Sequence, residues 1–208
     1  MATIHPSATL VPGKLELLQA WVPTQPWAAG LDTSALEQVG AYRFDDPDGE
    51  VGIETILVRS GDGPVLQIPL TYRGAPLAGA DEWLITTMEH TVLGDRWVYD
   101  ACGDPVYAAA LATAILGGGS EASLERDTDG DRAPVEPSMR VTGSGSSTDV
   151  GSVGLVDVRD LDGSTLVVTS VADLEVLRVV GDSWSLGGET LTGTWPGRDG
   201  SVLLAAAR

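Results

Sequence analysis

The segment from Glu82 to Gly117 constrains the fold of this chain most, because it predicts a strand, a turn at 93–96, a second strand and a helix in direct succession. Asp104 is a preferred residue just before a helix, Pro105 fits the first helical position, and Gly117 follows the last apolar residue. Small or apolar residues recur at near-helical spacing in this helix, namely Val106, Ala109, Ala110, Thr113 and Leu116. We therefore expect this face of the helix to lie on a sheet.

The residues before this segment predict one helix and several strands. A broad apolar stripe indicates a helix over 13–22, closed by Pro23. Strands are expected over 36–44, 51–59 and 65–72, with a strong turn signal at 46–49. Pro69 predicts an edge or a bulge for the third strand, because proline cannot donate a ladder hydrogen bond.

The second half of the chain changes in composition. Residues 117–138 are rich in Gly, Ser, Asp, Glu and Pro and predict a linker or mobile loop. Strand patterns return over 139–208 without a convincing helix. We therefore predict an α+β fold that is mostly β: a curved antiparallel sheet with packed helices in residues 1–116, the linker, and a second β-rich subdomain in residues 139–208.

Composition excludes several classes of partner and site. The net charge of −18 disfavours nucleic acid and anionic membranes, which are themselves polyanions. One cysteine and two histidines make a zinc site of the usual kind unlikely to form, and they predict no metal or other cofactor. The N-terminus lacks a signal-peptide pattern, and no apolar run reaches the ~18 residues of a membrane span. We expect a cytoplasmic protein.

Two glycine-containing runs have functional and structural interpretations. Residues 127–131 resemble a calcium loop, but glycine falls at the fourth position and Ser138 stands where a bidentate carboxylate is needed, so a solvated linker is favoured. Residues 143–148 could cradle a phosphate with backbone amides. They lack the lysine of a P-loop, so a flexible hairpin tip is favoured.

Other reactive side chains have equally ordinary explanations. Glu89 and His90 could act in acid–base catalysis, but no nucleophile accompanies them, and a half-buried strand position is favoured. Cys102 is expected to be a packed thiol. The six tryptophans are scattered along the chain, which favours core packing over a platform for sugar rings.

Several pieces of sequence occur together in one family. They are Leu15–Leu18 with Trp21–Pro23, Gln25–Gly30, Thr55–Val58, Leu66–Leu70, and Trp97–Ala101 before Asp104-Pro105. Through them, residues 10–116 resemble the N-terminal cap domain of actinobacterial maltokinases and related glucosamine kinases. The resemblance implies a curved antiparallel sheet with a helix packed on it. Proteins of this kind are sometimes labelled 1,4-α-glucan branching protein, although nothing here resembles the barrel or paired carboxylates of a branching enzyme.

The chain departs from such kinases after the cap. On the family's phosphate loop, Gly143 and Ser147 match, whereas Gly145, Ser146, Thr148 and Asp149 do not. The ATP-binding lysine would fall near position 168 or 169, but Lys14 is the only lysine. No counterpart of the catalytic lobe with its His-Gly-Asp loop is found in these residues. Since phosphoryl transfer needs positioned phosphates, a metal and a base, we expect no kinase activity from the chain alone.

The resemblance implies a stand-alone, non-catalytic cap-like protein that acts beside trehalose and α-glucan metabolism. In the family, the cap is a site of contact with other proteins, so trehalose synthase or a kinase-type enzyme is the expected partner. We predict that the interface includes Gln25, Trp27, Ala28 and Gly30, with Tyr72 and Arg73 at the end of a neighbouring strand. The alternative is a small-ligand binder, for a sugar or a nucleotide, or a minor enzyme that uses the concave face of the sheet.

Overall fold

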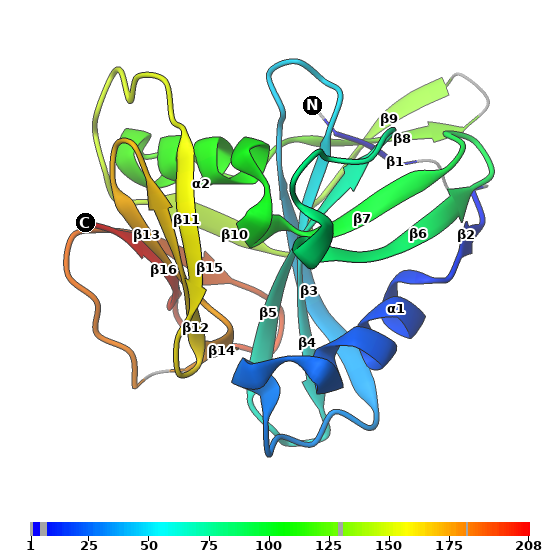
Figure 1. Cartoon of the computed structure of the whole chain (residues 1–208), viewed down its shortest axis with the longest axis horizontal. Coiled ribbons are helices and arrows are strands. Elements are labelled where there is room, and N and C mark those ends of the chain that lie inside the picture. Colours follow the sequence, from blue (N-terminus) through cyan, green and yellow to red (C-terminus); the bar gives the residue numbers. More distant parts are fainter. Residues whose placement is uncertain (1, 5–7, 129–130, 182) are drawn as a thin grey trace.

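Two antiparallel sheets with a helix between them form the body of the protein (Figure 1). The computed structural model describes residues 2–4, 8–128, 131–181 and 183–208. The protein is mostly β, as predicted. None of its described helices is long and apolar enough to span a membrane.

The first sheet is curled and consists mainly of strands from the first half of the chain. Its order is β2 (Leu10–Val11), β6 (Leu84–His90), β7 (Arg96–Asp100), β5 (Val65–Arg73), β4 (Gly52–Ser60) and β3 (Leu36–Phe44), with β14 (Val179–Val180) pairing with one end of β5. The predicted strands and the predicted turns between β3 and β4 and between β6 and β7 are therefore confirmed.

Strand β5 lies inside this sheet, so the expectation that Pro69 marks an edge or a bulge is wrong. Residues 65–66 pair with β14, and residues 70–73 pair with β7. Pro69 falls between these two stretches, opposite Thr55 of β4. Its missing N–H is tolerated there because neither β14 nor β7 pairs with this position.

The second sheet has six antiparallel strands. Its order is β10 (Arg140–Gly143), β15 (Glu189–Thr194), β16 (Val202–Ala207), β13 (Asp173–Leu177), β12 (Ser164–Thr169) and β11 (Leu155–Asp160). A third, small sheet contains β1 (Ala2–Ile4), β8 (Leu124–Thr128) and β9 (Asp131–Val135). Residues 117–138, predicted as a linker or mobile loop, therefore contain two paired strands, because β1 and the hairpin supply backbone partners that composition does not reveal. Residues 129 and 130 of the calcium-like run lie outside the described residues.

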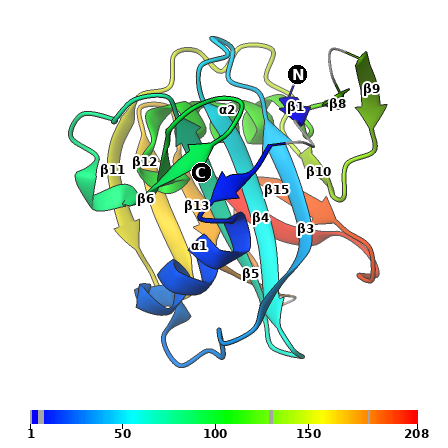
Figure 2. The same cartoon turned by 90° about the vertical axis from the view of Figure 1, so that its right-hand side faces the viewer.

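The two main helices lie on opposite faces of the curled sheet (Figure 2). Helix α1 (Lys14–Trp21) and two short 3₁₀ turns, η1 (Val22–Thr24) and η2 (Pro26–Ala28), cover one face. Helix α2 (Pro105–Gly117) packs between the other face and the six-stranded sheet, after the 3₁₀ turn η4 (Ala101–Gly103). A further turn, η3 (Asp81–Trp83), leads into β6.

Strand β4 contributes to both cores because its side chains alternate. Ile53 and Leu57 contact the core that contains α2, whereas Ile56 and Val58 contact the core that contains α1. This is the period of two expected of a strand that is covered on both faces.

The start of helix α2 is as predicted, whereas its end lies one residue later than Gly117 suggested and its buried face is different. The side chain of Asp104 accepts a hydrogen bond from the backbone N–H of Val106 at 2.9 Å, and Gly118 ends the helix with a φ of 69°. The buried residues are Tyr107, Ala108, Leu111, Ala112, Ala114 and Ile115, whereas Thr113 is exposed. Nearly all the residues of this helix are apolar, so its sequence does not define one face, and contacts on two sides decide which residues are buried.

The predicted second subdomain shares its core with the first. The amide of Gln67, in β5, donates to the backbone carbonyls of Leu177 (2.8 Å) and Leu204 (2.9 Å). Arg178 Nη2 lies 2.6 Å from the carboxylate of Asp100, and both side chains are almost completely buried. We call Asp100 and Arg178 the joint pair, because they connect the two sheets.

Candidate functional site

A groove of about 670 Å³ opens between the β3–β4 turn and the β6–β7 hairpin. Its volume lies within the ~300–1,000 Å³ that is usual for small-molecule sites. Segments far apart in the sequence line it, from the start of α1, the β3–β4 turn, the end of β5 and the β6–β7 hairpin. Its polar lining residues are Lys14, Arg43, Asp45, Asp46, Glu50, Tyr72, His90 and Arg96, and its larger apolar ones are Leu10, Phe44, Val51, Ile53, Met88 and Leu93.

Glu54 holds the basic side chains on one side of this groove. Its carboxylate lies 2.5 Å from Lys14 Nζ and 3.1 Å from Arg43 Nη2, and it accepts a hydrogen bond from the hydroxyl of Tyr72 at 3.0 Å. Burial alone would raise the pKa of Glu54, but the charges of Arg43 and Lys14 outweigh it and lower the pKa to about 2. Burial and the adjacent carboxylate raise the pKa of Tyr72. We call Lys14, Arg43, Glu54 and Tyr72 the Glu54 cluster.

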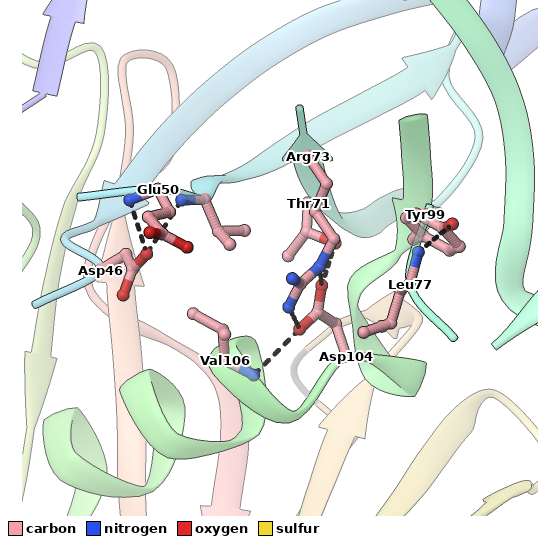
Figure 3. Close-up of polar contacts among 9 residues, drawn as sticks. Asp46, Glu50, Thr71, Arg73, Leu77, Tyr99, Asp104 and Val106 are labelled. Atoms are coloured by element: carbon pink, nitrogen blue, oxygen red, sulfur yellow. Dashed lines mark hydrogen bonds and ion pairs between the residues drawn. The ribbon is translucent and has the colours of Figure 1, made fainter. Parts of the chain in front are cut away.

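The β3–β4 turn forms an acidic rim on the groove. Asp46 accepts hydrogen bonds from the backbone N–H groups of Asp48 (3.1 Å), Glu50 (3.0 Å) and Val51 (2.9 Å). Figure 3 shows the side chain of Asp46 turned back toward Glu50. Because these contacts fix the Asp46 carboxylate to its own turn, its position does not depend on a ligand.

The β6–β7 hairpin contributes His90 and Arg96 from the other direction. His90 Nδ1 accepts from the backbone N–H groups of Val92 (3.2 Å) and Leu93 (3.1 Å), so the ring stabilises the hairpin turn. Arg96 Nη1 donates to the backbone carbonyl of Asp95 at 3.1 Å. Glu89 precedes His90 in the strand and does not line the groove, so the structure does not bring together the acid–base pair considered from the sequence.

Comparison with known families finds one similarity for the region of the curled sheet. Residues 21–104, which include strands β3 to β7, match the family model described as the maltokinase N-terminal cap domain. This part of the chain is therefore similar to the maltokinase N-terminal cap domain, and we call residues 21–104 the cap-like region. A comparison with curated proteins found no match to the chain.

Within the cap-like region, Trp27 is a core residue, which corrects the expectation that its loop leaves it without a structural role. Only 5% of its surface is exposed. Its ring packs edge-on against Trp21 at 5.9 Å between centroids, and the Arg178 guanidinium lies 5.2 Å from its centroid. Ala28 is also buried, whereas Gln25 is half-buried and Gly30 is exposed.

The two groups of predicted interface residues lie near opposite ends of α1. Lys14, at the start of the helix, lies 5.6 Å from the ring centroid of Tyr72, whereas Trp21, at its end, contacts Trp27. The structure therefore does not bring Gln25 to Gly30 together with Tyr72 and Arg73 as one patch.

Arg73 attaches helix α2 to the curled sheet. Its guanidinium binds the carboxylate of Asp104 through two nitrogens, Nε at 2.7 Å and Nη2 at 2.6 Å. The hydroxyl of Thr71 donates to the same carboxylate at 2.7 Å, and Figure 3 shows these groups converging at the start of α2. In the same view, the backbone N–H of Leu77 donates to the hydroxyl of Tyr99 at 2.8 Å. Arg73 is therefore occupied inside the molecule.

The loop considered as a phosphate cradle caps the C-terminal end of helix α2. The backbone N–H groups of Gly145 and Ser147 donate to the carbonyls of Ile115 (2.9 Å) and Leu116 (2.8 Å), and that of Gly143 donates to Gly119 (2.8 Å). A Cβ atom at Gly143 would lie 1.9 Å from the carbonyl oxygen of Ala114, so only glycine fits there. These amides are unavailable to a phosphate, and the carbonyl end of a helix repels anions. The expectation of a flexible hairpin tip is also wrong, because these hydrogen bonds attach the loop to the end of the helix.

The remaining candidates have structural roles. Cys102 is buried, and burial raises the pKa of its thiol. Trp195 is buried in the core shared by both sheets, and Trp184 Nε1 donates to the carbonyl of Val179 at 2.7 Å. In the part of the chain that the structure describes, no group of three or more His, Cys, Asp and Glu side chains could hold a metal ion.

The Glu54 cluster was not predicted from the sequence. Two signals could have revealed it: an acidic residue between Ile53 and Ile56 in an otherwise apolar strand, and the position of the only lysine near the start of a helix.

Proposed function

We propose that this protein is a non-catalytic accessory module of trehalose and α-glucan metabolism that acts in the cytoplasm by binding a protein partner. The match of residues 21–104 to the maltokinase N-terminal cap domain carries the proposal. The partner is a kinase-type enzyme or trehalose synthase.

The Gly143–Ser147 loop supports the non-catalytic part of this proposal. A phosphotransferase needs backbone amides or cations that hold the phosphates of ATP. The amides of Gly145 and Ser147 instead donate to carbonyls in the last turn of α2, and that of Gly143 donates to the carbonyl of Gly119 just after the helix. Residues 168 and 169, where the family lysine would fall, are valine and threonine.

A phosphoryl-transfer assay tests this part. The purified chain is mixed with ATP, Mg²⁺ and maltose, glucose or glucosamine, and ADP release is followed. We expect no sugar-dependent turnover. Turnover that a point substitution within the chain abolishes would overturn the proposal.

Binding to a partner is tested separately with purified proteins. Trehalose synthase and a maltokinase from the same host are immobilised, and association of the folded chain is measured by biolayer interferometry. We expect saturable binding to one of the two, and none by the heat-unfolded chain. Absence of binding to both contradicts the accessory role.

Small-ligand binding is a second candidate function, and the groove is the observation that favours it. The groove has the volume of a small-molecule site and combines fixed charged groups with apolar walls.

A further inference from the structure

We propose that the groove binds a small organic molecule that carries one anionic group, a carboxylate or a phosphate, on a partly apolar body. This inference rests on the second candidate function and specifies the class of its ligand. It follows from how the charges and the apolar residues of the groove are arranged.

The Glu54 cluster leaves positive charge available to the groove. One carboxylate is shared by two cations, Lys14 and Arg43, both of which line the groove. Each of the two donates one hydrogen bond to Glu54. Since an ammonium group has three donors and a guanidinium has five, both retain donors for an acceptor in the groove.

Arg96 adds a cation that forms no ion pair with any carboxylate that the structure describes. Its only polar contact within the described residues is with the backbone carbonyl of Asp95. The chain contains 30 acidic and 12 basic residues, so an arginine side chain that forms no ion pair with a described carboxylate is unexpected. A planar guanidinium that faces a groove is suited to binding a carboxylate or a phosphate through two nitrogens.

The acidic rim limits the charge of the ligand. Among the described residues, three cations, Lys14, Arg43 and Arg96, and three carboxylates, Asp45, Asp46 and Glu50, line the groove. Asp46 is held in place by backbone amides of its own turn. Because the two sets balance, a small, highly charged anion is repelled by the rim, whereas an anion on a larger body can place its charge beside the cations alone.

The apolar walls account for the rest of the ligand. Met88 and Phe44 are buried side chains that reach the groove, and Leu93 lines it while 46% of its surface is exposed. A partly apolar body that contacts Leu93 would remove this surface from water.

Isothermal titration calorimetry of the whole chain tests this proposal, with phenyl phosphate and benzoate as anionic probes and benzyl alcohol as a neutral probe of similar shape. We expect both anions to bind, and benzyl alcohol to bind at least about tenfold more weakly, because it lacks the charge-assisted hydrogen bonds. Equal binding of the neutral probe would show a ligand site of another class and overturn the anion proposal.

Substitutions locate the site. Arg96→Gln should weaken phenyl phosphate binding by about tenfold or more, since one charge-assisted contact is lost. Arg59→Gln, which removes the same charge from an exposed position outside the groove, should leave it unchanged. Binding that is the same in Arg96→Gln and the wild type, with unchanged melting temperatures, would overturn the proposal.

Leu93→Glu provides a second pair of variants that does not depend on Arg96. It places a negative charge on the groove wall and should weaken anion binding, whereas Val92→Glu, at the adjacent exposed position outside the lining, should not. Equal effects of the two would overturn the proposed location. If none of the probes binds, both this inference and small-ligand binding fail, whereas the partner proposal is judged by its own binding assay.

Discussion

Two buried carboxylates, Asp100 and Glu54, bind cations in different ways. Asp100 has one cationic partner, Arg178, and the side chains of this joint pair are 4% and 0% exposed. Glu54 has two, Lys14 and Arg43, whose side chains are 27% and 22% exposed. If one member of a buried ion pair is removed, the other stays buried without a partner, which costs stability. Glu54 has two cations, so it keeps one of them if the other is lost or binds a ligand. The joint pair therefore stabilises the contact between the two sheets, whereas the Glu54 cluster is better placed to bind a ligand in the groove.

The largest effect is expected from breaking the joint pair. Asp100→Ala leaves the Arg178 guanidinium buried without its carboxylate, and should lower the free energy of unfolding by about 3–5 kcal/mol. Urea denaturation followed by tryptophan fluorescence measures this change.

An exposed ion pair of the same kind is the control. Asp157 and Arg159 lie 2.6 Å apart, with side chains 45% and 64% exposed. Asp157→Ala should leave the free energy of unfolding nearly unchanged, because water replaces the lost contact. Similar losses of unfolding free energy in Asp100→Ala and Asp157→Ala would show that burial does not make the joint pair more important for stability than an exposed ion pair.

Trp27→Ala tests the packing around the same joint. The indole is buried in the core and lies against Arg178, so its loss should cost about 3–5 kcal/mol of stability. Trp27→Phe should cost much less, because the indole Nε1 has no hydrogen-bond partner among the described residues. A thermal melt measures both. A melting temperature for Trp27→Ala close to that of the wild type would show that Trp27 is not needed for the core and would favour its predicted role in an interface.

Acid should weaken the Glu54 cluster in a defined pH window. The pKa of Glu54 is lowered from 4.5 to about 2, so its contribution is complete above 4.5 and is lost as the pH falls toward 2. Over this window the stability difference between wild type and Glu54→Gln should shrink by about 2–3 kcal/mol, as linkage requires. Denaturant unfolding at several pH values measures it. A difference that stays constant with pH would show that Glu54 is not held as a buried carboxylate.

The sequence predicts local features of this protein better than long-range ones. Asp104 and Pro105 mark the start of α2 correctly because capping depends on neighbouring residues. By contrast, the partner of Asp100 is 78 positions away in the chain, and no local pattern links it to Arg178. The groove could be predicted only in part. Its turn at 46–49 is predicted, but its cations come from α1, β3 and β7, which only the curled sheet brings together.

Among the substitutions at the joint pair, in the core and at the groove, the smallest effect is expected from Lys14→Met. The methionine keeps most of the apolar stem of lysine, and Glu54 retains Arg43 and the hydroxyl of Tyr72. Because the lost contact is partly exposed and one of three, stability should fall by about 1 kcal/mol or less, measured by urea denaturation. A loss as large as that of Asp100→Ala would show that the cluster is not redundant, and that Lys14 is needed for the fold and is not available to a ligand. A small loss of stability, together with weaker phenyl phosphate binding, would identify Lys14 as a side chain that serves the groove more than the fold.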